Sequence, residues 1–140
     1  MNPLTLSHVL AAVLTLSVSG AGIAGPREDQ FVAYAAAAKV ANPAFAGFSA
    51  ARGKTLHTQS FGLGKPDTPA CTSCHGNDPR GAGRTPAGKT VEAMALSVTP
   101  TRYVDPAKVE KWFKRNCNEV LGRECNAQEK GDWLTFMAGQ

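Results

Sequence analysis

The clearest run of apolar residues at helical spacing lies in the last third of the chain. It follows Asp105-Pro106, a pair that favours a helix start because Asp caps the first turn and Pro fits the first helical position. The apolar positions fall at i, i+3, i+4, i+8 and i+11, and they are Val109, Trp112, Phe113, Cys117 and Val120. This spacing predicts an amphipathic helix with one buried face.

Two further segments predict helices. The first runs from Glu28 to Ala41 and is closed by Asn42-Pro43, and its apolar face carries Phe31, Tyr34, Ala35 and Ala38. The second opens at Asn126 and Glu129, which resemble a capping box, and it continues through Met137 with Trp133, Phe136 and Met137 as its apolar residues.

Glycine and proline interrupt the chain between these segments, from Thr58 to Ala70 and again after His75 as far as Lys89. No segment alternates apolar and polar residues clearly enough to predict a strand. We therefore expect a small all-α domain, built of helices and long loops.

The first 24 residues have the pattern of a secretory signal peptide. Residues 4–18 are mostly Leu, Val and Ala, residues 20–24 are mostly small, and no Lys, Arg, Asp or Glu precedes Arg27. The apolar run is short for a membrane span, which needs about 20 residues. We expect cleavage near Ala24, export to the periplasm, and one mature domain of residues 25–140 without a membrane span. Because the first residues carry no Lys or Arg, an uncleaved N-terminal anchor is the alternative.

Residues 71–75 read Cys-Thr-Ser-Cys-His, the C-x-x-C-H pattern of covalent haem attachment. Each of Cys71 and Cys74 can form a thioether with one vinyl group of a haem, and His75 can then serve as the proximal ligand of the iron. The motif occurs once in the chain, which predicts one haem c.

Other uses of a C-x-x-C pair fit the chain less well. A thioredoxin-like redox pair would expect a βαβ pattern, which is not visible. A zinc site would need a second ligand pair at metal spacing, and neither Cys117 with Cys125 nor His8 with His57 has it. An oxidising compartment instead suits a disulfide between Cys117 and Cys125, which would leave no spare thiol.

The formal net charge of +4 is mildly basic. The basic residues are scattered and no binding motif accompanies them, which argues against a nucleic-acid partner. A mildly basic surface suits an acidic redox partner.

Asn116 is the unusual residue on the predicted helix after Asp105, because at 100° per residue it falls near the centre of the apolar stripe. A buried carboxamide without a partner costs about 1–3 kcal/mol, so we expect something to satisfy it. A hydrogen bond to the backbone or a helix C-cap would do so, and so would the iron on the side opposite His75. Met94, Met137 and His57 are further ligand candidates; for His57 we favour a position at the surface or beside a haem propionate.

Several stretches resemble the sphaeroides haem protein family of monohaem cytochromes c. They are Cys-Thr-Ser-Cys-His at 71–75, Lys-Val-Glu-Lys-Trp-Phe-Lys-Arg-Asn-Cys at 108–117, Gly-Arg-Glu-Cys at 122–125 and Glu129-Lys130. The resemblance covers most of the chain after residue 24. It implies a class I cytochrome c-like fold, His75 as the proximal ligand, Asn116 as the distal ligand, and a Cys117–Cys125 bridge beside the haem.

The resemblance also implies a function. In this family the ferrous protein binds O₂, NO or CO, and a dihaem cytochrome c is the electron donor; a membrane cytochrome b is a second candidate donor. A carboxamide is a weak, neutral donor that suits ferric iron better than ferrous iron, so reduction is expected to release Asn116. Enzymatic reduction of O₂ or a nitrogen oxide at the opened iron is a further alternative. The alternative function is a simple electron carrier with Met94 or Met137 permanently on the iron.

Overall fold

The computed structural model describes residues 25–140, and it is an all-α domain with one minimal sheet. The elements in order are α1 (Pro26–Ala41), α2 (Ala50–Thr58), α3 (Thr72–His75), β1 (Gly83–Arg84), β2 (Thr90–Val91), α4 (Pro106–Leu121) and α5 (Ala127–Ala138). The two strands pair antiparallel, with Gly83 opposite Val91. The predicted signal peptide lies outside the described residues. Within them, no helix has the length and apolar character needed to cross a membrane.

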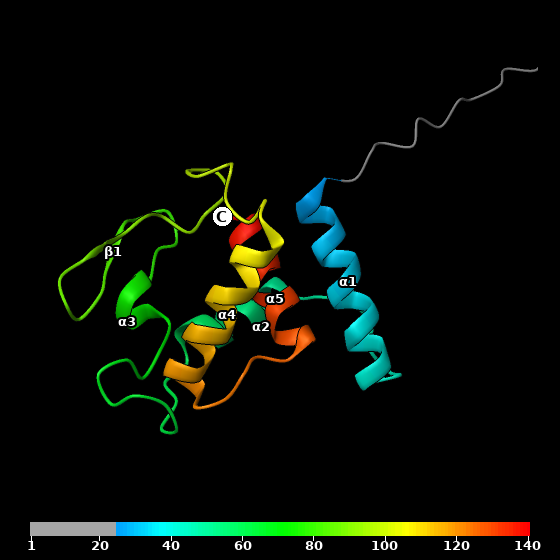
Figure 1. Ribbon diagram of the computed structural model, residues 1–140, viewed down its shortest axis with the longest axis horizontal. Helices are drawn as coiled ribbons and strands as arrows, with labels where there is room; N and C mark the ends of the chain where they lie inside the picture. Colours follow the sequence, from blue (N-terminus) through cyan, green and yellow to red (C-terminus); the bar gives the residue numbers. More distant parts are fainter. Residues whose placement is uncertain (1–24) are drawn as a thin grey trace, which may run out of the picture.

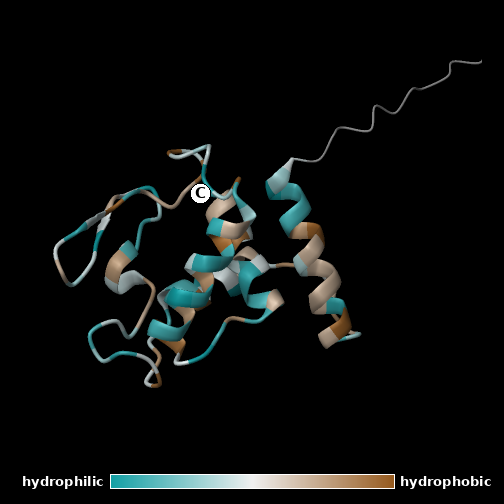
Figure 2. Ribbon diagram, in the orientation of Figure 1, coloured by the Kyte–Doolittle hydropathy of each residue, from teal (hydrophilic) through white to brown (hydrophobic). Residues whose placement is uncertain are grey.

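Helix α5 is the centre of the fold. It contacts α2 and α1 (Figure 1), and α4 packs against it through the Phe113 and Trp133 rings, whose centroids are 5.6 Å apart. Figure 1 also shows α1 on one side of this group and α3 with the two strands on the other. α1 is hydrophilic at its start and mostly hydrophobic beyond it (Figure 2). The haem-attachment motif therefore lies at the edge of the helical core.

The three predicted helices are confirmed, with small differences at their ends. α4 begins where Asp105 accepts a hydrogen bond from the Lys108 N–H at 3.0 Å. The capping box of α5 is present, because the Asn126 side chain accepts from the Glu129 N–H and the Glu129 carboxylate accepts from the Asn126 N–H. α1 starts two residues before the predicted position, with Pro26 in its first turn.

Helix α2 is the element that the sequence pattern did not predict. It has little hydrophobic periodicity and contains Gly53, a weak helix former. The glycine is explained by packing, because a Cβ at Gly53 would overlap the backbone carbonyl oxygen of Asp132 on α5. Ser49, which accepts a hydrogen bond from the Arg52 N–H at 3.3 Å, is the one local signal of the helix start.

The loop before the haem motif is fastened to the end of α4. The Lys65 N–H donates to the Glu119 carbonyl oxygen at 2.6 Å, and a Cβ at Gly64 would overlap the same carbonyl group. Gly122, with a φ of 70°, ends α4 in the left-handed conformation against Leu63. The segment that leads into Cys71 is thus held against α4.

Candidate haem site

The haem-attachment motif forms a single helical turn. The Cys71 carbonyl oxygen accepts hydrogen bonds from the N–H groups of Cys74 at 3.3 Å and His75 at 3.1 Å. The turn ends at Gly76, whose φ of 71° lies in the region that glycine adopts without strain. β1 packs directly on this turn, because a Cβ at Gly83 would overlap the Cys74 carbonyl oxygen. Both cysteines and the histidine therefore share one short, well-supported element.

The two cysteines of the turn take part in no disulfide, and each is half-buried. The Cys71 thiol lies 3.8 Å from the Leu56 carbonyl oxygen on α2. Burial raises the pKa of the Cys71 thiol to about 11, and burial also raises the pKa of Cys74. Two protonated, unpaired thiols on one turn are the groups that thioether attachment needs.

His75 is neutral and only partly satisfied by the protein. Its Nδ1 atom is buried and has no hydrogen-bond partner among residues 25–140. Burial, with smaller effects of the nearby His57 and Arg102 side chains, lowers the pKa of His75 to about 4. Neutral imidazole is the form that binds iron. Together with the two thiols, this unsatisfied imidazole fits a covalently attached haem.

His57 is not at the surface, so the first of the two positions expected for it is wrong. Its side chain is completely buried, with Nε2 at 3.0 Å from the Gly76 carbonyl oxygen and Nδ1 accepting from the Trp133 indole N–H at 3.3 Å. Because an indole N–H can only donate, Nε2 carries the proton and donates to Gly76. Burial lowers the pKa of His57 despite this bond. Both nitrogens are engaged, which argues against His57 as an iron ligand.

The buried face of α4 differs from the prediction. It consists of Val109, Phe113, Cys117, Val120 and Leu121, whereas Trp112 is 43 % exposed. The expectation that Trp112 belongs to the buried stripe is therefore wrong, because the buried face lies on the side of the helix that carries Cys117 and Leu121. Asn116 lies at the flank of this face and is half-buried, so the expectation that it sits near the centre of the stripe is also wrong. Its carboxamide makes no hydrogen bond to residues 25–140, whereas the Asn118 carboxamide donates to the Lys114 carbonyl oxygen at 2.6 Å.

A disulfide joins Cys117 on α4 to Cys125 before α5, with their Cα atoms 5.6 Å apart. Both residues are buried. The bridge follows Asn116 directly, so it ties the Asn116 end of α4 to the start of α5.

The two methionine candidates have other surroundings. Met137 on α5 is completely buried in the core. Met94 is 7 % exposed, and its sulfur accepts a hydrogen bond from the Arg102 guanidinium at 3.0 Å. Both methionine side chains are thus already in contact with other parts of the polypeptide.

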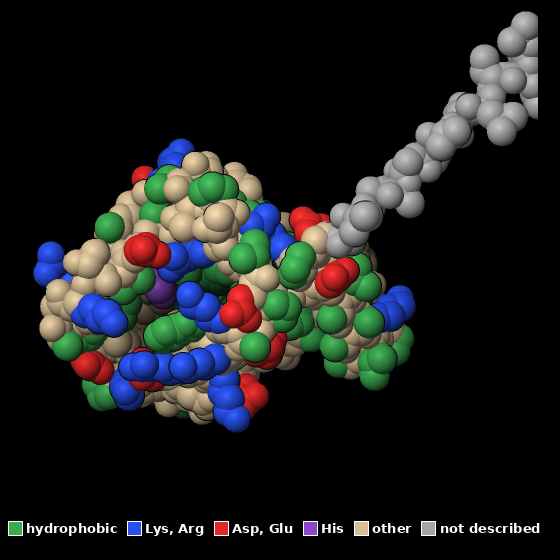
Figure 3. Space-filling view, turned by 45° about the horizontal axis from the view of Figure 1, so that its top comes forward, with side chains coloured by type: hydrophobic (Ala, Val, Ile, Leu, Met, Phe, Trp, Pro, Cys, Tyr) green, Lys and Arg blue, Asp and Glu red, His purple; other side chains and the backbone are tan. Residues whose placement is uncertain are grey.

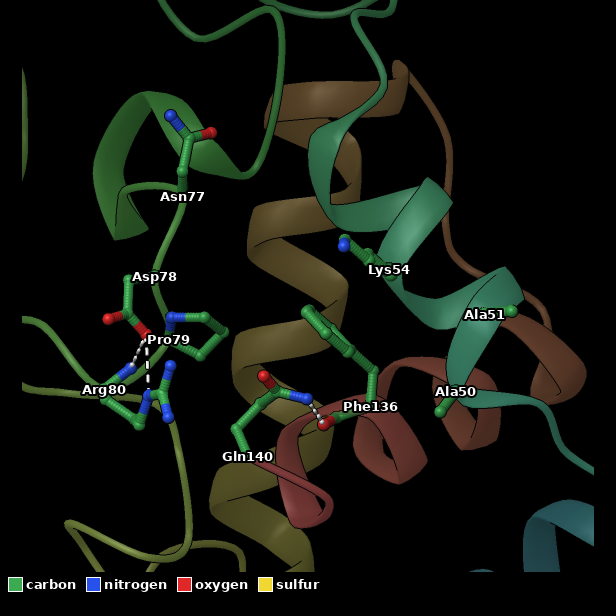
Figure 4. Close-up of a pocket in the computed structure, with 9 residues that line it drawn as sticks. All are labelled: Ala50, Ala51, Lys54, Asn77, Asp78, Pro79, Arg80, Phe136 and Gln140. Carbon is green, nitrogen blue, oxygen red and sulfur yellow. Dashed lines mark hydrogen bonds and ion pairs between the residues drawn. The ribbon is translucent and has the colours of Figure 1, made fainter.

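One face of the molecule is hollowed, and Lys and Arg side chains gather around a histidine within the hollow (Figure 3). Of the two described histidines, His75 is partly exposed and His57 is not. A separate open pocket of about 560 Å³ lies between α2, the segment after α3 and the end of α5 (Figure 4). Lys54, Arg80 and Phe136 line it, and the predicted haem-site residues do not.

A helical domain with one C-x-x-C-H turn, whose two cysteines lie outside the disulfide and whose imidazole is neutral, defines a c-type cytochrome with a single covalently bound haem. Comparison with known proteins agrees. Residues 43–137 match the family described as Domain of unknown function (DUF1924). Cytochrome c-type protein SHP of Cereibacter sphaeroides is 45% identical over 130 residues, which is 91% of this chain and 96% of the relative. Cytochrome c'' of Methylophilus methylotrophus is 32% identical over 105 residues, 74% of this chain and 73% of the relative.

Solved structures give the same result. Oxidised SHP, described as an oxygen-binding cytochrome c, has a TM-score of 0.76 and 44% identity, and covers 83% of this chain and 98% of its own. Oxidised cytochrome c'' has a TM-score of 0.72 and 30% identity, and covers 82% and 94%. The chain therefore belongs to the family of monohaem c-type cytochromes that includes SHP and cytochrome c''. The all-α, class I cytochrome c-like fold and the covalent haem are confirmed.

Proposed function

We propose that this cytochrome binds diatomic gases under redox control, with His75 and Asn116 as the axial ligands of the ferric iron. Reduction releases Asn116, and the ferrous protein then binds O₂, NO or CO. His75 and the two thioethers of Cys71 and Cys74 are the permanent attachments. Asn116 is the ligand that leaves.

The observation that supports this proposal best is the unpartnered carboxamide of Asn116. It lies half-buried on α4 and has no hydrogen bond to the described part of the chain. Asn118, two residues further on, is exposed and bonds to its own helix backbone. A carboxamide held partly out of water without a protein partner is available to a ligand.

Two relatives make release of a ligand plausible. SHP is described as an oxygen-binding cytochrome c. The solution structure of cytochrome c'', which is 31% identical with a TM-score of 0.70, addresses the structural basis of haem-ligand detachment.

The chemistry of the carboxamide explains why its bond depends on oxidation state. The bound haem supplies an iron that accepts two axial ligands and changes charge by one electron. The neutral amide of Asn116 is a weaker donor than imidazole and suits the harder ferric ion better than the ferrous ion. His75 is the stronger donor, and its neutral form is already present at physiological pH, because burial lowers its pKa.

The disulfide restricts the movement that we propose. The Cys117–Cys125 bridge closes a short loop directly after Asn116, and a loop of this size stabilises a protein by about 2.5 kcal/mol in the chain-entropy model. With the helix end fixed, release of Asn116 requires rotation of its side chain and only a small shift of α4. A structural bridge of this kind agrees with export to the periplasm.

The alternative of a permanent methionine ligand has less support. A methionine ligand would require Met94 to give up its contact with Arg102, or Met137 to leave the helical core. Electron donation by an exported dihaem cytochrome c or by a membrane cytochrome b remains part of the proposal. The Lys and Arg side chains around the hollow suit an acidic partner surface (Figure 3).

The test is the spectrum of ferric Asn116→Ala. We expect loss of the sixth protein ligand, with a high-spin or water-ligated ferric spectrum. Asn118→Ala is the matched control on the same helix, and it should keep the low-spin wild-type spectrum. A ferric Asn116→Ala spectrum identical to wild type would show that Asn116 is not a ligand.

A further inference from the structure

A continuous series of ring contacts leads away from His75 through the core. The His75 and His57 ring centroids are 6.3 Å apart, and the His57 and Trp133 centroids are 6.2 Å apart. The Trp133 ring lies 5.6 Å from Phe113, which lies 6.4 Å from Tyr34. The series crosses the domain from α3 to α1, passing through α2, α5 and α4 in turn.

Only two rings of this series are readily oxidised, the indole of Trp133 and the phenol of Tyr34. Electron tunnelling falls exponentially with distance, and the intervening His57 and Phe113 rings keep each gap short. The indole is also bonded to His57 through its N–H at 3.3 Å. Trp133 is therefore the oxidisable residue that is coupled most directly to the His75 side of the series.

The chain has two tyrosines and two tryptophans, so the structure offers internal comparisons. Trp112 is 43 % exposed on α4 and lies under the Arg115 guanidinium, outside the series. Tyr103 contacts Trp133 edge to face, with centroids 5.9 Å apart. On distance alone, Tyr103 is the nearer electron donor for Trp133.

The two tyrosines differ in the group that can accept the phenolic proton. A phenol loses its proton when it loses an electron, so it needs a base within hydrogen-bond reach. The Tyr103 hydroxyl donates to the Met94 carbonyl oxygen at 2.8 Å, and an amide carbonyl is a very poor base. The Tyr34 hydroxyl donates to the carboxylate of Glu110, which can take up the proton.

The surroundings keep this pair in the required protonation states. Burial and the Glu110 carboxylate raise the pKa of Tyr34, so the phenol stays protonated until it is oxidised. Partial burial alone would raise the pKa of Glu110, but hydrogen bonds from Lys130, at 2.7 Å, and from Tyr34 outweigh it and lower the pKa. Glu110 is therefore an ionised carboxylate that is ready to accept a proton.

We propose that Trp133 and Tyr34 form a one-electron relay that draws oxidising equivalents away from the haem when the protein reacts with hydrogen peroxide. Hydrogen peroxide takes up two electrons and two solvent protons and becomes two water molecules. One electron is taken from the haem iron and the other from Trp133. Tyr34 then reduces Trp133, and its phenolic proton moves to a carboxylate oxygen of Glu110. The products at this end are a neutral Tyr34 radical and protonated Glu110, whose total charge is one unit more positive than that of the starting phenol and carboxylate, because one electron has left the pair.

This activity goes beyond reversible gas binding. The relay leaves the radical on Tyr34 of α1, at the far end of the series from the haem-attachment turn. A small reductant or a partner protein can restore the tyrosine there without access to the haem.

The test uses the haem-containing protein, rapidly mixed with hydrogen peroxide, frozen, and measured by electron paramagnetic resonance. Ring-deuterated tyrosine identifies a tyrosyl signal through its narrowed hyperfine pattern. We expect such a signal in the wild type, its loss in Tyr34→Phe, and its retention in the control Tyr103→Phe. A signal that survives in Tyr34→Phe and disappears in Tyr103→Phe would overturn the assignment of the terminal residue.

Two further pairs test the route. Trp133→Phe should delay or abolish the tyrosyl signal, whereas Trp112→Phe should leave it unchanged; circular dichroism and the Soret band verify that each variant is folded. Glu110→Gln keeps a hydrogen-bond acceptor but removes the base, so it should lower the radical yield. Equal yields in all variants, no radical, or a Soret band that does not respond to peroxide would each contradict the relay. Carbon monoxide binding to the reduced protein tests the gas-binding proposal independently.

Discussion

Substitution of His57 by Phe is a direct test of how the helical core supports the haem ligand. His57, near the end of α2, is completely buried between Gly76, the residue after His75, and Trp133 on α5. Phe has a similar shape and keeps the apolar contacts, but it removes both ring nitrogens. The Trp133 indole N–H and the Gly76 carbonyl oxygen then each lose their partner.

The size of the effect follows from the burial of these two groups. An unsatisfied buried polar group costs about 1–3 kcal/mol. Trp133 is only 8% exposed, so its N–H should cost an amount near the middle of that range, and the half-buried Gly76 should cost less. We expect a total loss of about 3 kcal/mol, which corresponds to a fall in Tm of about 10 °C in a domain of this length.

The assay is denaturation of the ferric protein by guanidinium, followed by circular dichroism, in a double-mutant cycle with Trp133→Phe. In the wild type, Trp133→Phe removes a satisfied donor and should destabilise the protein. In the His57→Phe background it removes an orphaned donor, so it should be much less harmful or even stabilising. If the two free-energy changes simply add, the hydrogen bond between these rings does not support the fold as described.

Two other substitutions test the packing around the site. Asp132→Asn weakens three hydrogen bonds that this buried carboxylate accepts at the start of α2. Because its arginine partner is half-exposed, we expect a loss of about 2 kcal/mol in the free energy of unfolding, measured by guanidinium denaturation. The control Asp78→Asn, in an exposed ion pair, should leave the denaturation midpoint unchanged, and equal effects of the two substitutions would contradict this expectation. Gly83→Ala should greatly lower the haem content of the purified protein, because its Cβ overlaps the haem-attachment turn. The control Gly81→Ala has room for the added Cβ and should keep a normal haem content. A normal haem content in Gly83→Ala would show that the turn tolerates displacement.

Local signals predicted the helices that begin with strong caps. Asp105-Pro106 and the Asn126–Glu129 capping box correctly placed the starts of α4 and α5. α2 was missed because its formation depends on a close approach to α5 at Gly53, and such long-range contact leaves almost no periodicity in the sequence. The brief β1–β2 pairing is also too short to leave an alternating pattern.

The chemistry of the site was only partly accessible from the sequence. The C-x-x-C-H motif predicted the haem attachment, because the spacing of the three groups is a local property. The burial of His57 depends on Trp133, which lies far along the chain, so the sequence around His57 gave no sign of it. For the same reason, helical periodicity placed Trp112 in the stripe and Asn116 near its centre, but could not show that Trp112 is exposed and that Asn116 lies at the flank.

The central claim is that Asn116 leaves the iron on reduction, and carbon monoxide binding tests it most directly. Dithionite-reduced wild-type protein is mixed with carbon monoxide in a stopped-flow spectrometer. We predict rapid binding with a large change in the Soret band, at a rate that rises in proportion to the carbon monoxide concentration. A reduced spectrum that stays six-coordinate and unchanged after mixing would show that a permanent ligand occupies the distal position.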